Sequence, residues 1–127
     1  MFFKSSLTTI LIGLASQASA VDTYNCVRTA LGLSGFKSFA AAEAYFPKET
    51  VFQVDGSRVG SDYYGMGGNS EDQYGRMKFT FKLDIESSFK PTIIYTYWPT
   101  TNKFTSRMNT PHGFENIIGG SGHCKKS

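Results

Sequence analysis

The segment between Pro91 and Pro99 has the highest density of β-forming residues in the chain. Every position from Thr92 to Trp98 is β-branched or aromatic. Both alternating sets of side chains are bulky, which is typical of a central strand that is covered on one face and carries further groups on the other. The two prolines end the strand because they cannot donate to the ladder. The second face of this strand therefore holds either more core or a functional site.

A second segment, Met77–Ile85, alternates apolar and polar side chains and predicts a half-buried antiparallel strand. Residues 86–90 predict the turn of a hairpin with the strand ending at Trp98. The Gly- and Tyr-rich segment Val59–Gly75 predicts a loop. The last expected strand ends before Gly119–Cys124, whose glycines are a turn signal. The remaining expected elements are short strands at Val21–Leu33, Thr50–Val54, Asn102–Met108 and Phe114–Ile118, and a helix at Phe36–Phe46 that ends at Pro47. One helix and about five strands indicate the α+β class.

Residues 1–20 have the features of a secretory leader, with Lys4, an apolar run at Leu7–Leu14 and the small residues Ala18–Ala20 before the cleavage point. The apolar run is too short to span a bilayer. We therefore expect a secreted, membrane-free protein whose residues 21–127 form a single domain. The net charge of +3, or +2 without Lys4, is too small to indicate nucleic-acid binding by itself.

The two cysteines, Cys26 and Cys124, lie near the two ends of the expected domain. In a secreted chain such a pair predicts a disulfide. We expect neither a metal nor another cofactor, because Cys26 has no cysteine or histidine nearby and the pair His123–Cys124 has no known ligand spacing.

Few side chains in the sequence could transfer protons. The two histidines, His112 and His123, each follow a turn signal, and no paired carboxylates share a strand face. Lys103 and Arg107 share one face of an expected strand. They are either ordinary exposed cations or contacts to a phosphate group.

Three short motifs resemble the small guanyl-specific fungal ribonucleases of the T1/F1 type. The segment Asp55–Ser61, followed by Tyr64, is similar to the segment that precedes the Tyr-x-His pair of that family. Tyr95–Pro99 resembles its Tyr-Glu-Trp-Pro strand, and Asn116–Gly122 resembles its closing Val-Ile-Thr-His-Thr-Gly segment. The resemblance implies one helix packed on a twisted antiparallel sheet.

The same resemblance implies that the catalytic positions are vacated. The supporting tyrosine is retained as Tyr64, but its companion histidine falls on Met66, the base glutamate on Tyr97 and the acid histidine on Gly120. The comparison also implies that Tyr97 points outward from its strand. Arg107 is the candidate for the phosphate-binding arginine, although the intervening segment is shorter here. A tyrosine with a pKa near 10 is a poor base at neutral pH. Each lost proton-transfer group costs about 10²–10⁴-fold in rate, so the resemblance implies an inactive enzyme.

The expected mature start, with its Tyr24-Asn25-Cys26 motif, resembles the RNase-like effectors associated with haustoria of cereal powdery mildew fungi. That resemblance implies a catalytically inactive virulence protein that is delivered into the host cell. Its implied role is to bind host proteins or RNA and suppress plant immunity, and some members of that family are recognised by intracellular immune receptors.

We expect a monomer whose contact surface combines residues 62–75 with the segment from Pro99 to Pro111. The residues expected to bind a partner are Asp62, Tyr63, Tyr64, Met66, Asn69, Glu71, Asp72, Lys103 and Arg107. Two alternatives remain open. One is a secreted guanyl-preferring ribonuclease with residual activity through Arg107 or His123. The other is a non-cleaving RNA-binding protein that stacks bases on four aromatic residues, Tyr63, Tyr64, Tyr97 and Trp98.

Overall fold

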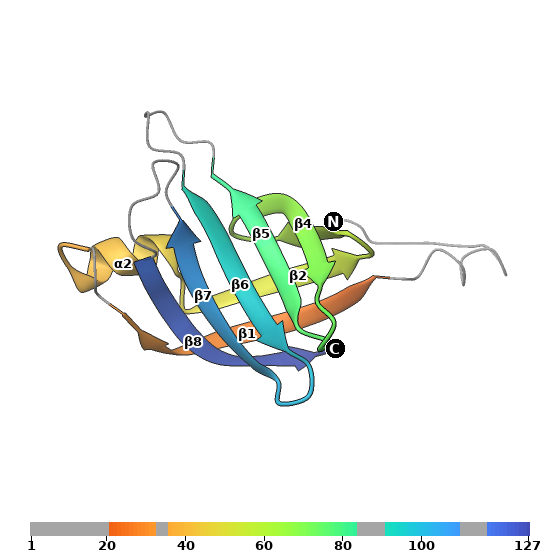
Figure 1. The fold of residues 1–127 in the computed structure, drawn as a ribbon. Helices are drawn as coiled ribbons and strands as arrows, with labels where there is room; N and C mark the ends of the chain where they lie inside the picture. Colours follow the sequence, from red (N-terminus) through yellow and green to blue (C-terminus); the bar gives the residue numbers. More distant parts are fainter. Residues whose placement is uncertain (1–20, 33–35, 84–90, 110–116) are drawn as a thin grey trace, which may run out of the picture.

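The computed structural model describes residues 21–32, 36–83, 91–109 and 117–127. In these segments the chain forms eight strands and one short helix (Figure 1). The elements are β1 (Asp22–Leu31), α2 (Phe39–Tyr45), β2 (Glu49–Asp55), β3 (Arg58–Ser61), β4 (Gly65–Glu71), β5 (Met77–Lys82), β6 (Thr92–Trp98), β7 (Lys103–Asn109) and β8 (Ile117–Lys126). The expected leader, the turn at 86–90 and His112 lie outside the described residues.

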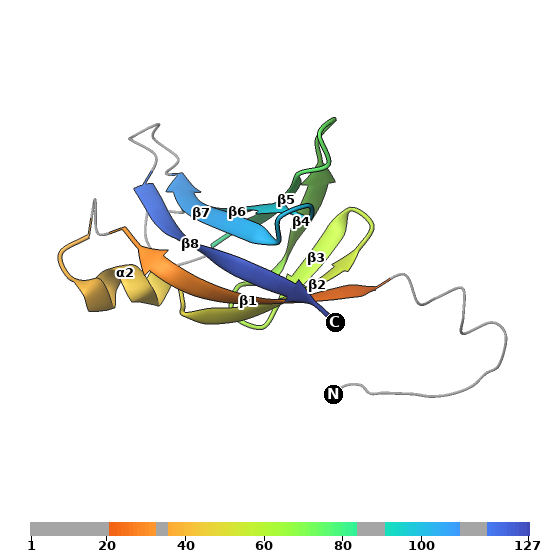
Figure 2. The same cartoon turned by 90° about the horizontal axis from the view of Figure 1, so that it is seen from below.

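Each strand pairs antiparallel with the next one, and β8 pairs back with β1, so that the sheet closes into a barrel (Figures 1 and 2). The expectation of an α+β fold of the T1/F1 type, with a helix packed on an open twisted sheet, is therefore wrong. The helix α2 is short and lies at one end of the barrel (Figure 2). Its N-cap is Ser38, whose hydroxyl accepts a hydrogen bond from the Ala41 N–H, and the helix ends at Tyr45, before Pro47.

The hairpin predicted from the two best β segments is confirmed, because β5 and β6 pair over their full length. The predicted loops are wrong, since β3 and β4 occupy most of residues 58–71 and β8 includes the glycines of residues 119–122. These glycines allow close packing. A Cβ at Gly119 would lie 2.5 Å from the Phe46 ring, and one at Gly122 would collide with the Val27 carbonyl.

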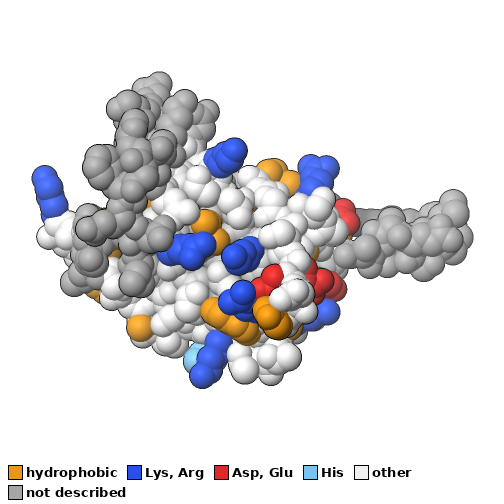
Figure 3. All heavy atoms as spheres, viewed as in Figure 1, with side chains coloured by type: hydrophobic (Ala, Val, Ile, Leu, Met, Phe, Trp, Pro, Cys, Tyr) orange, Lys and Arg blue, Asp and Glu red, His pale blue; other side chains and the backbone are white. Residues whose placement is uncertain are grey.

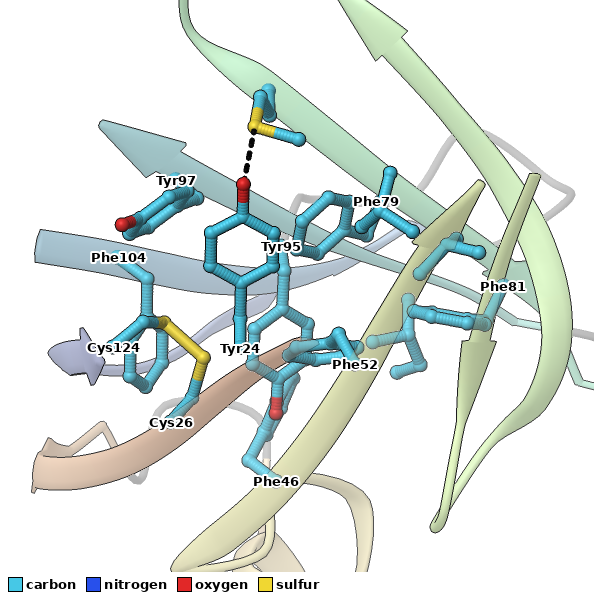
Figure 4. Close-up of a cluster of buried hydrophobic side chains, with 14 of the residues drawn as sticks. Tyr24, Cys26, Phe46, Phe52, Phe79, Phe81, Tyr95, Tyr97, Phe104 and Cys124 are labelled. Carbon is cyan, nitrogen blue, oxygen red and sulfur yellow. Dashed lines mark hydrogen bonds between the residues drawn. A yellow bond between two sulfur atoms is a disulfide. The ribbon is translucent and has the colours of Figure 1, made fainter. Parts of the chain in front are cut away.

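The interior of the barrel is filled by aromatic side chains from the inward positions of most of the strands (Figure 4). Phe52 lies at the centre, with ring centroids 4.9 Å from those of both Phe79 and Tyr95. An eight-stranded barrel is just wide enough for side chains to fill it. The inward face of β6, with Ile93, Tyr95 and Tyr97, is therefore packed core.

The predicted disulfide between Cys26 and Cys124 is confirmed. The two cysteines are directly opposed on β1 and β8, with Cα atoms 3.9 Å apart, and both are buried. The disulfide therefore crosses the seam at which the first and last strands close the barrel.

Removal of this disulfide should lower stability substantially. The cross-link closes a loop with a sequence separation of 98 residues, and the loop-entropy model assigns such a loop roughly 4–5 kcal/mol of stabilisation as an upper estimate. We expect Cys26→Ala/Cys124→Ala to lower the urea midpoint, measured by the fluorescence of the single tryptophan. A reducing agent should lower the midpoint of the wild type and leave that of the double variant unchanged. Equal midpoints for the oxidised wild type and the double variant would contradict this role.

Substitution of a close-packed glycine in β8 should be far more costly than substitution of an open one. We expect Gly122→Ala to destabilise the protein by about 1–3 kcal/mol or more, because the new methyl group meets strand backbone that cannot move aside. Gly68→Ala is the matched control, since its nearest neighbour would lie 3.9 Å away. Chemical denaturation of both variants measures the difference, and equal losses would refute the packing argument.

Candidate functional site

The end of α2 is attached to the barrel by three side chains. Three consecutive carbonyl groups, which have no partner within a helix, accept hydrogen bonds from the barrel. The pairs are Tyr63 Oη with Ala44 O, Tyr64 Oη with Tyr45 O, and Arg28 Nη1 with Phe46 O, each at 2.5 Å. Arg28 also forms an ion pair with Glu43 at 3.0 Å. Tyr64, which the ribonuclease resemblance assigns a supporting role in catalysis, therefore holds the helix in place.

Tyr64 and Tyr95 form a buried hydroxyl pair, with their Oη atoms 3.0 Å apart. Burial raises the pKa of Tyr95 to about 12, and burial together with the neighbouring Tyr95 raises the pKa of Tyr64 further. Both phenols are protonated at neutral pH. Neither can act there as a general base.

The positions that correspond to catalytic residues do not converge. Tyr97 points into the barrel, where its hydroxyl donates to Asn102 Oδ1 at 2.8 Å, so the expectation of an outward Tyr97 is wrong. Gly120 is also buried, and its amide and carbonyl bond to the Ser106 hydroxyl. Met66 is 63% exposed on β4. No common cleft for an acid and a base forms from these described positions.

Arg107 lies on β7 and faces away from the barrel interior, since Ser106 and Met108 on either side of it are the buried residues of that strand. It is thus on the opposite side of the barrel wall from Tyr97. The expected grouping of a phosphate-binding arginine with the vacated base position is not formed.

The expected partner-binding residues in 62–75 are partly occupied within the protein. Asp62 accepts hydrogen bonds from a threonine hydroxyl and a backbone amide of β2. The amide of Asn69 donates to the Gly56 carbonyl at 2.8 Å, and Asp72 pairs with Arg76. Met66 and Glu71 are exposed. This segment is mainly strand and ordered turn, and Asp62, Asn69 and Asp72 form hydrogen bonds or ion pairs within the protein.

A basic face covers the outside of β5, β6 and β7. We define it by the outward cations Lys78, Lys82, Lys103 and Arg107. Figure 3 shows Lys and Arg side chains spread over this side of the barrel. The strands β5 to β8 contain no Asp or Glu within their bounds. Segregation of charge creates a local positive potential even though the net charge is small.

A surface groove of about 510 Å³ adjoins the basic face at the end of β6. We call it the Trp98 groove, and its lining includes Trp98, Lys103, His123 and the hydroxyl-bearing residues Thr29, Thr105 and Ser121. The strand register aligns Trp98 with Lys103 and Lys103 with His123 across three neighbouring strands. Sequence reasoning identified Lys103 but did not place Trp98 or His123 beside it. Only the pairing of β7 with β8 brings His123 there.

The turn between β6 and β7 fixes one wall of the groove. Asn102 adopts a positive φ of 59°, a conformation that asparagine tolerates better than most residues. Its side chain accepts from Tyr97 in the interior, and its carbonyl accepts from the Cys124 amide at 2.8 Å. The turn is therefore anchored both to the core and to the disulfide seam.

No family model matches the chain, and no curated protein or solved structure matches it. In the described segments, no helix is long and apolar enough to cross a membrane. The same segments contain no group of three His, Cys, Asp or Glu side chains that could hold a metal ion.

Alkaline pH should destabilise the protein through its buried tyrosines. Unfolded tyrosines lose their protons near pH 10, whereas Tyr64 and Tyr95 keep theirs to higher pH in the folded state. The unfolded state then binds fewer protons, so the free energy of unfolding should fall between about pH 10 and 12. Each group contributes at most about 1.4 kcal/mol per pH unit.

Urea midpoints across this pH range measure the slope. We expect a shallower slope for Tyr95→Phe and an unchanged slope for Tyr74→Phe, because Tyr74 is 75% exposed. The same slope in wild type and Tyr95→Phe would show that the buried pair is not responsible.

Proposed function

We propose that this chain is a secreted, non-enzymatic effector that binds a host macromolecule through its basic face and suppresses host immunity. The charge segregation on β5–β8 carries the proposal, because it provides a contact surface that is independent of the packed interior. The expected secretory leader and the confirmed disulfide are consistent with export through an oxidising compartment.

The absence of catalytic activity is part of the proposal. It is supported by the scatter of the positions that would have to act together, since Tyr97 and Gly120 are buried and Arg107 lies on the outer surface. Cleavage of RNA needs one group to remove a proton and another to supply one at the same phosphate. These positions offer no such pair.

A protein partner is better supported than RNA. Of the four aromatic residues considered for base stacking, Tyr97 is buried, and Tyr64 packs against Tyr95 beneath α2. Tyr63 is 49% exposed, but its hydroxyl is bonded to α2 and it does not line the Trp98 groove. Binding of single-stranded RNA usually uses successive accessible rings along a basic groove. Of these four residues, only Trp98 lines the groove that adjoins the basic face. One ring cannot stack successive bases of a single strand.

The decisive experiment is expression of residues 21–127 in host leaf cells, with the elicitor-induced oxidative burst as the measurement. We expect the wild-type chain to reduce the burst and Lys78→Glu/Lys82→Glu/Lys103→Glu to lose this effect through charge repulsion. The matched control is Lys37→Glu/Lys48→Glu/Arg58→Glu, which makes the same change in net charge at exposed positions elsewhere and should act as wild type.

Each other outcome is informative. No suppression by the wild type would refute the effector role, and equal loss in both triple variants would refute the assignment to the basic face. The purified oxidised protein can also be incubated with RNA that contains all four bases. Cleavage of that RNA, abolished by Arg107→Ala or His123→Ala, would refute the non-enzymatic part of the proposal.

A further inference from the structure

The Trp98 groove combines one flat apolar ring with the ammonium group of Lys103 and the imidazole of His123. The indole of Trp98 is half-buried, while Lys103 and His123 are exposed beside it on β7 and β8. Thr105 and Ser121, paired on adjacent strands, add hydroxyl groups that donate or accept hydrogen bonds. Among the residues that the structure describes, no acidic side chain lines this groove. Its chemistry therefore complements a ligand that has both an apolar group and negative charge.

The shape of the groove is set before any ligand arrives. The turn that forms one wall is held by the Asn102 bonds to Tyr97 and to the Cys124 amide. On the other side, the Thr29 hydroxyl donates to the Ser121 carbonyl at 3.3 Å and ties β1 to β8. A preorganised groove loses little conformational entropy when it binds a partner.

The closed barrel restricts how a partner can bind. Every described strand is hydrogen-bonded to a neighbour on both sides, so the sheet has no free edge for an added strand. A partner must therefore be recognised by side chains on the outer surface. One aromatic ring surrounded by polar and charged groups has the composition of a protein–protein hot spot.

We propose that the Trp98 groove receives an acidic segment of a partner protein. One apolar side chain of that segment lies against the indole. Its carboxylates pair with Lys103 and accept a hydrogen bond from the imidazole N–H of His123. The inference rests on the proposed function, because it names the class of partner that the effector binds. The adjoining cations of the basic face extend the favourable field along β5 and β7.

A random-decapeptide phage library selected on the immobilised, oxidised mature protein tests the proposal. We expect enriched peptides to carry several Asp or Glu residues next to an aromatic or large aliphatic residue. Parallel selections on Trp98→Ala/His123→Ala and on Lys103→Glu should not enrich them. The second variant retains the tryptophan, so loss of binding there cannot be attributed to altered packing of the ring.

The consensus peptide is then titrated while the fluorescence of Trp98, the single tryptophan, is measured. We expect Lys103→Glu to weaken binding by about tenfold or more. Lys82→Glu, which makes the same charge change on the basic face but outside the groove, should alter the affinity much less. Added salt should weaken binding to the wild type.

The proposal fails if the enriched peptides have no excess of acidic residues, or if they bind the groove variants as well as the wild type. It also fails if polyuridylate binds at the groove and the selected peptides do not. The leaf-cell assay separates the two proposals. Retained suppression by Trp98→Ala/His123→Ala, with loss in the triple variant of the basic face, would refute the groove and leave the effector role intact.

Discussion

The pairing of β1 with β8 is the interaction on which the rest of the structure depends. These strands come from opposite ends of the domain, and their ladder turns a meander of hairpins into a closed barrel. The disulfide crosses this ladder, while Gly120 and Gly122 permit the close approach of the two strands. Without closure, two strands would have unpaired edges and the aromatic interior would be open to water.

Closure also divides the molecule into two chemical environments. Inward positions carry the aromatic core, and even the buried Arg28 is neutralised by Glu43 and bonded to the end of α2. Outward positions on β5–β8 carry cations without acidic neighbours in the same strands. Because successive residues of a strand alternate between the two environments, adjacent residues such as Tyr97 and Trp98 have different roles.

The sequence predicts the two strongest β segments and the disulfide, but it predicts neither the glycine-rich strands nor the closure of the barrel. The β5–β6 hairpin follows from alternation over residues 77–85 and the dense β-forming run that ends at Trp98, and the disulfide follows from a cysteine pair in a chain with a leader. Glycines 67, 119 and 122 predict a loop or a turn when the sequence is read alone, because turns commonly require glycine. Here they stand where a Cβ would meet a neighbouring strand or the Phe46 ring, a reason that depends on contacts distant in sequence. The ribonuclease resemblance rests on short motifs, which constrain local conformation and not strand order.

The residues of the Trp98 groove were also predicted only in part, because their proximity depends on contacts between segments that are distant in sequence. Lys103 and Arg107 could be placed on one face of a strand from their spacing, and both lie outside the barrel. Trp98 lies on β6 and His123 on β8, with β7 between them in the sheet. Their proximity therefore depends on the register of β7 with β8. The seam that stabilises the barrel thus also assembles the groove, because the Cys124 amide anchors the turn beside Trp98. Outward side chains lie outside the core and the seam, so the proposed binding surface can vary in chemistry while the core and the seam keep its geometry.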